Sequence, residues 1–376
     1  MEMVDLQSQY RRIKDEIGQA VANVLDNAAY INGPDVDAFA DELADYLGVP
    51  HVIPCANGTD ALQIALMSLG LRAGDEVIVP AFTYAAAVEA IVLLGMTPVL
   101  VDVNPDTYNI DTQQIEQTIS SRTKAIIVVH LFGQSCDMEP VMNLAGKYNL
   151  YVIEDNAQSL GALYTDSARD TYKTGTIGHI ATTSFFPTKP LGCYGDGGAL
   201  FTTDAALSER IRSIANHGQA GEKFHHRILG CNSRLDTLQA AILRIKLRHI
   251  DEYTGLRQRV ARRYDEALLG APNIIPPRRA RYSNHVYHQY TIRVAEEHRE
   301  ALRDHLARCG IPTVVYYPHP INEQPAFRVL VRTTQPLRQA IRLSRTVLSL
   351  PIHSEISEND QNNIIDAVLQ YAHRHR

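Results

Sequence analysis

One lysine, Lys189, lies between an apolar run and a glycine-rich loop in the segment Ser184-Phe-Phe-Pro-Thr-Lys-Pro-Leu-Gly-Cys-Tyr-Gly-Asp-Gly-Gly198. A hydroxyl side chain, Ser184, precedes it by five residues, and farther upstream the run Val152-Ile-Glu-Asp-Asn-Ala-Gln158 turns from apolar to acidic. An apolar, glycine-rich setting removes water from a lysine and lowers its pKa. Its amine can then act as a nucleophile and form a Schiff base.

These residue types, in this order, point to pyridoxal 5′-phosphate (PLP), which enzymes bind through a Schiff-base lysine and an Asp beside the ring nitrogen. Each signal alone has a simpler explanation. A lysine in a loop is usually solvated, and an Asp after an apolar run often caps a turn or a helix. The ordered combination favours the cofactor site.

Two further segments fit such a site. In Cys55-Ala-Asn-Gly-Thr-Asp60, the pair Gly58 and Thr59 opens a helical pattern, and a helix N-terminus is a good seat for a phosphate. A structural Asn or Thr N-cap accounts for these residues equally well. Phe82, in a loop after an apolar run, would either stack on a flat cofactor ring or belong to the core.

The elements that must position these residues alternate between short apolar runs and helical patterns. The runs are continuously apolar, as in strands covered on both faces, and the alternation predicts an α/β domain with a mostly parallel sheet. Ligands of such sheets bind at the carboxyl ends of the strands. The expected strands are Glu76–Val79, Pro98–Val103, Ala125–His130, Tyr151–Ile153, Thr182–Phe186 and Ala199–Thr202, and the helices between them include Tyr84–Leu94, Met138–Tyr148 and Ala205–Asn216.

The C-terminal part reads as a smaller α+β domain. We expect a helix over Thr254–Leu269 and, after Pro276-Pro277, a strand, a helix, a strand, a loop and a final helix from about Glu358. The two expected strands are Val286–Val294 and Thr313–Tyr317, with the helix Glu296–Cys309 between them. The predicted division is a large domain over residues 1–250 and a small domain over residues 251–376.

Composition excludes several classes of protein. The chain has 376 residues, 45% hydrophobic and 21% charged, with a net charge of -6, so nothing indicates a nucleic-acid-binding surface. Its start has no basic region followed by an apolar one, and no run is long enough for a membrane span. The five cysteines form no CxxC pair, so we expect no metal site and no disulfide framework, and a cytoplasmic location.

The ordered motifs resemble the DegT/DnrJ/EryC1/StrS family of sugar-nucleotide aminotransferases. The resemblance extends over nearly the whole chain and rests on motifs whose order and spacing are specific. They are Ala56-Asn-Gly-Thr59, Pro80-Ala-Phe-Thr-Tyr84, Glu154-Asp-Asn-Ala-Gln158, Ser184-Phe-Phe-Pro-Thr-Lys189, Gly195-Asp-Gly-Gly198, Asn216-His-Gly218 and Asn232-Ser-Arg-Leu-Asp-Thr-Leu-Gln-Ala-Ala241.

The resemblance implies PLP as cofactor, the fold-type I architecture of PLP enzymes and a homodimer with shared active sites. It implies that Lys189 bonds to the cofactor and moves the proton during catalysis, and that Asp155 pairs with the ring nitrogen. The remaining implied cofactor contacts are Gln158 beside the ring hydroxyl, Phe82 over a ring face, Gly58, Thr59 and Ser184 at the phosphate, and Asn232 at the phosphate of the partner's cofactor.

The substrate is suggested by a departure from the family pattern. In Tyr317-Pro-His-Pro-Ile-Asn322, Asn322 stands where the family commonly has a histidine. This departure resembles enzymes acting on UDP-2-acetamido-2-deoxy-3-oxo-glucuronate, as do the segments Ile31-Asn-Gly-Pro34, Gly192-Cys-Tyr-Gly-Asp196 and Asn232-Ser-Arg234. These enzymes take the amino group of L-glutamate, release 2-oxoglutarate and make a 3-amino sugar for O-antigen or related polysaccharides. Arg234 is a candidate partner for the uronate carboxylate, or else forms a subunit-interface salt bridge. Tyr316 and Tyr317 are expected to line the sugar pocket.

Two alternatives remain open at this point. Amination at C4 of a 4-oxo deoxysugar nucleotide would use the same fold and catalytic residues with a different pocket. A non-catalytic PLP-fold regulator belongs to another class, but no DNA-binding appendage or basic stretch supports it. A nicotinamide dehydrogenase is weaker still, because the glycines of residues 192–198 do not form the GxGxxG pattern.

Overall fold

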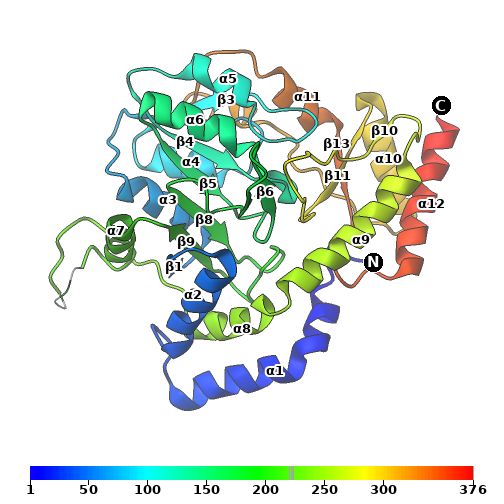
Figure 1. Ribbon diagram of the computed structural model, residues 1–376. Helices are drawn as coiled ribbons and strands as arrows, with labels where there is room; N and C mark the ends of the chain where they lie inside the picture. Colours follow the sequence, from blue (N-terminus) through cyan, green and yellow to red (C-terminus); the bar gives the residue numbers. More distant parts are fainter. Residues whose placement is uncertain (220, 222–223, 376) are drawn as a thin grey trace.

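The computed structural model describes residues 1–219, 221 and 224–375, and its centre is an eight-stranded sheet (Figure 1). All neighbouring strands are parallel except where β9 pairs with β1 and with β8. The prediction of an α/β fold with a mostly parallel sheet is confirmed. In spatial order the strands are β1 (His51–Cys55), β9 (Gly198–Thr202), β8 (Ile180–Ser184), β5 (Tyr151–Asp155), β4 (Thr123–Val129), β2 (Glu76–Pro80), β3 (Thr97–Val101) and β12 (Arg332–Thr333).

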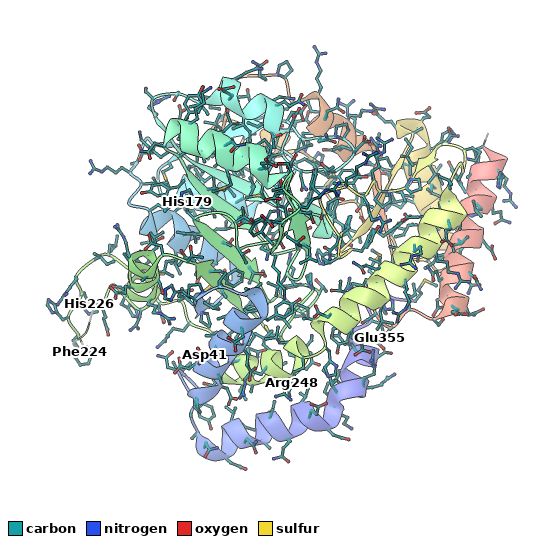
Figure 2. The ribbon with its side chains drawn as sticks, viewed as in Figure 1. Asp41, His179, Phe224, His226, Arg248 and Glu355 are labelled. Carbon is teal, nitrogen blue, oxygen red and sulfur yellow. The ribbon has the colours of Figure 1, made fainter. Side chains whose placement is uncertain are left out.

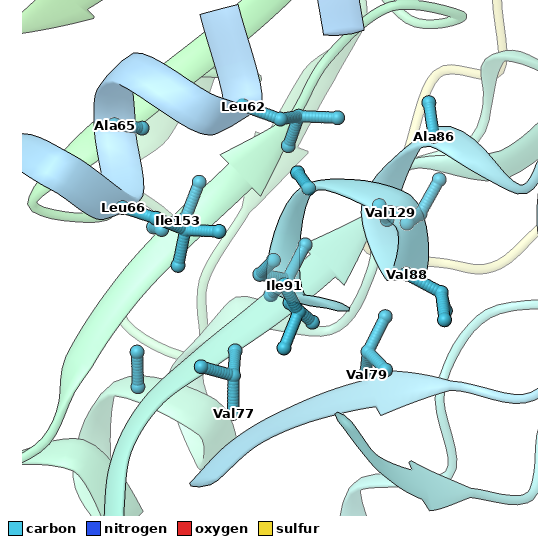
Figure 3. Close-up of a cluster of buried hydrophobic side chains, with 14 of the residues drawn as sticks. Leu62, Ala65, Leu66, Val77, Val79, Ala86, Val88, Ile91, Val129 and Ile153 are labelled. Carbon is cyan, nitrogen blue, oxygen red and sulfur yellow. The ribbon is translucent and has the colours of Figure 1, made fainter. Parts of the chain in front are cut away.

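Side chains of the central strands alternate between two buried clusters, one on each face of the sheet. On β2, Val77 and Val79 join the cluster under α3 and α4 (Figure 3). Ile78 instead joins the cluster under α6. Because both faces are covered, polar residues have no solvated face to occupy, which explains the continuous apolar runs. The helices of this part are α1 (Leu6–Asn27), α2 (Pro34–Leu47), α3 (Gly58–Ser68), α4 (Ala86–Leu93), α5 (Thr112–Ile115), α6 (Met138–Tyr148) and α7 (Ala205–Ala215).

The C-terminal part has its own buried cluster and a three-stranded antiparallel sheet. The expected strand at Thr313–Tyr317 is wrong: only Val314 forms a bridge, to Ser349 of β13. β13 and the helix before it, which replace part of the expected loop, were missed. The elements here are α9 (Ile250–Leu268), β10 (Ile274–Ile275), β11 (Tyr290–Val294), α10 (Glu296–Arg308), α11 (Arg338–Thr346), β13 (Val347–Leu350) and α12 (Glu358–Arg374). They are preceded by α8 (Thr237–Leu247), which packs on α1 and α2 of the large part.

The division at residue 250 coincides with the start of α9 and stays a prediction. Several contacts join the two parts. β12 returns to the edge of the large sheet, where Arg332 pairs with the buried Glu76 at 2.9 Å. At the other end of the chain, Arg12 of α1 forms an ion pair with Glu355 at 2.9 Å, beside the C-terminal helices (Figure 2).

A short 3₁₀ turn, η2 (Leu131–Gly133), follows β4 and receives the segment before β11. The Gly133 carbonyl accepts the Val286 N–H at 2.7 Å, and the Phe132 carbonyl accepts the Gln289 N–H at 3.2 Å. Gly133 has a φ of +101°, and a Cβ there would lie 2.7 Å from the backbone nitrogen of His288. Only glycine allows this close approach.

We expect Gly133→Ala to lower the free energy of unfolding by about 2 kcal/mol or more, because the new methyl group meets backbone and the φ becomes strained. Urea unfolding measures the loss. The control is Gly146→Ala in α6, where a Cβ meets nothing within 4 Å; this change should stabilise by up to about 1 kcal/mol. Equal stability of Gly133→Ala and the wild type would contradict the tight docking.

Every helix among the described residues is too short or too polar to span a bilayer.

Candidate active site

A cavity of about 500 Å³ opens at the carboxyl ends of the central strands. The last residues of β4, β5 and β8 line it on one side, and residues from the C-terminal part line it on the other. Of the residues predicted from the sequence, eight line this cavity: Gly58, Thr59, Asp155, Gln158, Ser184, Lys189, Tyr316 and Tyr317.

The first turn of α3 forms one wall. Asn57 caps the helix, since its side chain accepts the Asp60 N–H at 2.8 Å. The cap is therefore Asn57, and Thr59 keeps its hydroxyl for the cavity. Gly58 lies so close to β8 that a Cβ would be 2.7 Å from that of Ser184. Helix N–H groups and two hydroxyls converge here, which is the donor set that a phosphate needs.

Lys189 faces Asp155 in the desolvated part of the cavity. Its backbone N–H donates to Phe186 in a turn after β8, at 2.9 Å. Burial lowers the pKa of Lys189, although the Asp155 charge opposes the shift. Burial also raises the pKa of Asp155, although a hydrogen bond from the Ala157 N–H and the charge of Lys189 both act to lower it. A buried carboxylate gains most from a cationic partner, and a protonated ring nitrogen would be one.

Gln158 connects the wall to the C-terminal part. Its Oε1 accepts the Phe132 N–H at 2.8 Å, and its Nε2 donates to the hydroxyl of Tyr317 at 3.1 Å. Burial raises the pKa of Tyr317, so the phenol stays protonated at neutral pH. These bonds fix the amide in one orientation and leave one amide hydrogen for a ligand.

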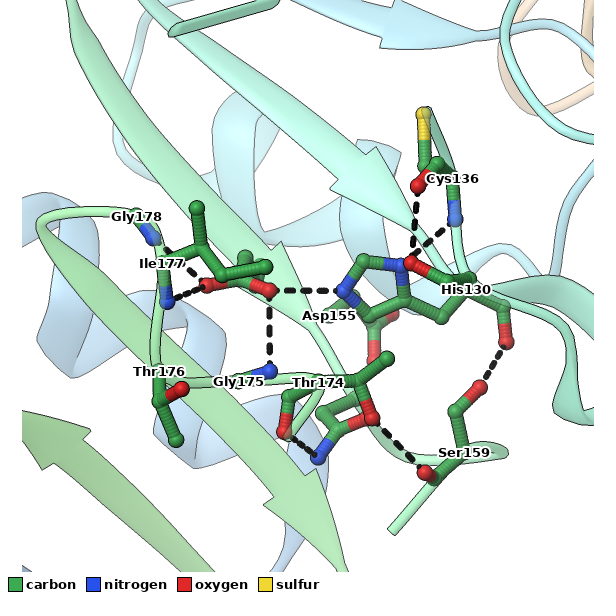
Figure 4. A network of polar contacts seen from close by, with 12 residues as sticks. His130, Cys136, Asp155, Ser159, Thr174, Gly175, Thr176, Ile177 and Gly178 are labelled. Atoms are coloured by element: carbon green, nitrogen blue, oxygen red, sulfur yellow. Dashed lines mark hydrogen bonds and ion pairs between the residues drawn. The ribbon is translucent and has the colours of Figure 1, made fainter. Parts of the chain in front are cut away.

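Behind Asp155, the preceding acid Glu154 is buried in a network of hydrogen bonds (Figure 4). Its carboxylate lies 2.8 Å from His130 Nε2 and accepts the N–H groups of Gly175, Ile177 and Gly178 at 2.6–2.8 Å. His130 Nδ1 accepts the N–H of Cys136, so the ring proton sits on Nε2 and points at Glu154.

The network also keeps Glu154 ionised. Burial alone would raise its pKa, but the hydrogen bonds from His130, Gly178 and Gly175 hold that pKa below its ordinary value. His130 is therefore a hydrogen-bonded structural histidine.

A family model described as the DegT/DnrJ/EryC1/StrS aminotransferase family matches residues 11–369. The chain belongs to this family. It is 47% identical to the UDP-2-acetamido-2-deoxy-3-oxo-D-glucuronate aminotransferase of Pseudomonas aeruginosa over 94% of this chain and 95% of that protein.

Solved structures agree with this assignment. A DegT DnrJ EryC1 StrS aminotransferase from Brucella abortus matches with a TM-score of 0.95 and 40% identity, covering 99% of each chain. The Bacillus subtilis protein NtdA, with bound cofactor PMP, matches with a TM-score of 0.87 and 30% identity, covering 96% of this chain and 82% of that one. The resemblance seen in the sequence is confirmed.

Four residues predicted for the site of this aminotransferase lie outside its cavity. Phe82 is buried in the core, with its ring edge-on to those of Phe132 and Tyr317. Asn232 is exposed, Arg234 is half-buried, and Asn322 lies in the 3₁₀ turn η3 (Ile321–Glu323). Their predicted roles stay predictions, and that of Asn232, at the partner's cofactor, concerns a second chain.

Sequence reasoning missed several residues that line the cavity of the aminotransferase. Tyr84, two positions after Phe82, is 61% exposed and lies on its wall. His288 and Gln289 lie inside the expected strand Val286–Val294, but β11 begins only at Tyr290. The others are Asn57, Leu62, Thr83, Ala86, Val129, Phe132, Ala157, Phe186, Thr188 and Asp196.

We expect Glu154→Gln to cost the aminotransferase about 2–4 kcal/mol of unfolding free energy at pH 7, because a neutral amide cannot accept all the donors. The folded pKa lies below the ordinary 4.5, so the contribution of Glu154 is complete above that value. It is lost as the pH falls through the folded pKa.

Urea unfolding of wild type and variant at several pH values checks this. The gap between them should be largest near neutrality and shrink in acid. Glu116→Gln, at an exposed carboxylate paired with Lys147, is the control and should leave stability nearly unchanged. A gap that widens in acid would contradict the proposed ionisation of Glu154.

Proposed function

We propose that this aminotransferase uses PLP to transfer the amino group of L-glutamate to C3 of UDP-2-acetamido-2-deoxy-3-oxo-D-glucuronate. The product would be the 3-amino sugar nucleotide used for a surface polysaccharide such as O-antigen. The observation that carries the reaction class is Lys189 opposite Asp155 in one desolvated cavity with a phosphate seat. The substrate is supported by the 47% identity to the Pseudomonas aeruginosa enzyme of that name.

The residues of the cavity fit the parts of the cofactor. Gly58, Thr59 and Ser184 would hold the phosphate, and Asp155 would pair with the ring nitrogen. Gln158 would use its remaining amide hydrogen at the ring oxygen. We assign the covering of a ring face to Tyr84 instead of Phe82, because Tyr84 lines the cavity and Phe82 does not.

Bound PLP supplies an electron sink for the carbanion formed when a proton leaves the amino carbon. Lys189 would hold the cofactor, and its amine, once free, would take the α-proton of L-glutamate. In the second half-reaction the same amine would return a proton to C3 of the sugar. Burial favours the uncharged amine that this base needs.

The carboxylates of the substrates require a cation that one chain does not place in the cavity. Among the described residues that line it, Lys189 is the only one with a cationic side chain. Arg234 and Asn232 lie outside it, on a segment that also carries the exposed apolar side chain of Leu229, 85% exposed. Exposed apolar surface of this kind usually binds another chain.

We propose a cytoplasmic homodimer in which Arg234 and Asn232 of each subunit complete the cavity of the other. Phe224, on the same loop, extends from the body beyond α7 (Figure 2) and is 76% exposed, which supports a contact there. The five cysteines are all free, which fits a reducing compartment.

Incubation with PLP, L-glutamate and the 3-oxo sugar nucleotide, with the product identified by mass and NMR, tests the proposed substrate. We expect an amine at C3. Amination of a 4-oxo deoxysugar nucleotide instead would keep the enzyme class and overturn the substrate.

Lys189→Ala should lower turnover by at least about 10⁴-fold, since the group that moves the proton is gone. The phosphate seat remains, so the variant should still bind PLP noncovalently, measured by absorbance. Borohydride should fix the cofactor to the wild type and not to the variant. Near-normal turnover in the variant would overturn the role of Lys189.

Two inactive variants should complement each other when they are co-expressed. Lys189→Ala and Arg234→Ala remove residues that different subunits contribute to one shared site, so a mixed dimer keeps one intact site of two. Random pairing makes about half of the dimers mixed, so about one quarter of wild-type activity should return. The control pair, Lys189→Ala with Asp155→Asn, affects the same half and should restore nothing. Full activity of Arg234→Ala alone, or no recovery in the mixture, would contradict the shared site.

A further inference from the structure

His288 lines the cavity and has a buried ring nitrogen without a hydrogen-bond partner, which no role described so far uses. The side chain is 4% exposed, and its Nδ1 has no hydrogen-bond partner. Among the described residues that line the cavity, it alone has a fully buried polar side-chain atom without a partner. Leaving such an atom unpaired costs free energy, so a ligand atom that pairs with it would gain affinity.

The position of His288 is fixed from two sides. Its backbone lies on Gly133, where no side chain would fit, and its carbonyl accepts a hydrogen bond from the buried Arg257 at 3.4 Å. The side chains around it are already paired: Gln158 with Tyr317, and Tyr316 with Gln289. His288 is therefore held in place with its Nδ1 still available.

The contact at the other ring nitrogen determines which nitrogen of His288 carries the proton. Its Nε2 lies 3.5 Å from the amide nitrogen of Gln289. An amide nitrogen only donates, so Nε2 accepts and the ring proton is on Nδ1. Burial, with the charges of Lys189 and Arg257, holds the pKa of His288 well below its ordinary value. The ring is thus a neutral donor.

A neutral N–H donor beside Lys189 suits an uncharged ligand oxygen. A carboxylate would instead favour a cationic partner. Lys189 must reach the sugar carbon that receives the amino group, so the ketone oxygen on that carbon enters the same part of the cavity. Negative charge develops on this oxygen as nitrogen adds to the carbon, and a preorganised donor stabilises it.

We propose that His288 is a further catalytic residue, whose Nδ1–H donates a hydrogen bond to the ketone oxygen of the sugar nucleotide. This inference rests on the proposed aminotransferase function, and it assigns His288 to the half-reaction with the sugar. In the glutamate half-reaction a ketone oxygen forms only when 2-oxoglutarate is released, after the proton transfer that changes the cofactor absorbance. The absorbance change with L-glutamate therefore does not depend on this donor.

The test compares the two half-reactions of PLP-loaded His288→Leu and His288→Asn, each followed by cofactor absorbance in single turnovers. Leu removes the donor, whereas the Asn amide places one near the position of Nδ1. We expect His288→Leu to slow the sugar half-reaction about 10- to 100-fold and the glutamate half-reaction less than about threefold. His288→Asn should recover most of the loss.

The matched control is His353→Leu. His353 is also buried, with an unpartnered Nδ1, but it lies outside the cavity, so both half-reactions should keep near wild-type rates. Equal slowing of the two half-reactions in His288→Leu, or no recovery in His288→Asn, would show a structural role and overturn the proposal.

A second readout does not depend on turnover. NMR of protein labelled with ¹⁵N-histidine should show His288, identified by its loss in His288→Asn, as a neutral ring protonated on Nδ1. A ring protonated on Nε2 overturns the inference. If the wild type aminates only a 4-oxo sugar nucleotide, the proposed substrate fails, and the half-reactions are compared with that sugar.

Discussion

The alternation of side chains along β5 places two adjacent acids, Glu154 and Asp155, on opposite faces of the strand. In a strand, neighbouring side chains point to opposite faces, so Glu154 enters the hydrogen-bond network with His130 while Asp155 faces the cavity. The Glu154 network fixes the end of β5 and the loop from Gly175 to Gly178. A one-residue shift of register would exchange the two acids. The position of Asp155, and with it that of Lys189, depends on the burial of its neighbour.

A second constraint holds the two walls of the cavity together. Gln158, at the end of β5, bonds to Phe132 in η2 and to Tyr317 in the C-terminal part. Phe132 in turn accepts the N–H of Gln289. The Gln158 amide therefore connects the loop after β5 to η2 and to the segment that carries Tyr317. Both segments are held by the same side chain.

The sequence predicts the large sheet and most of the cavity because their signals are local. Continuous apolar runs mark buried strands, and Lys189, Asp155 and Ser184 follow such runs directly. Phe82 and Tyr84 show the limit, because an aromatic in a loop gives no indication of which way its ring points. The sequence predicts a strand over residues 286–294, which includes His288, but the docking of residues 286–289 on η2 leaves only Tyr290–Val294 as a strand. α11 and β13 were missed because their contacts are with distant segments.

The contacts between the two ends of the chain have a consequence for its synthesis. β12, which pairs with β3 at the edge of the large sheet, and Glu355, which pairs with Arg12 of the first helix, both lie in the last fifty residues. A nascent chain therefore exposes the outer edge of β3 until β12 has been synthesised, whereas α1 can already pack on α8. Late closure of such long loops is slow and leaves strand edges open to pairing with other chains. Ribosome-bound intermediates of this protein should depend on chaperones more than its finished fold suggests.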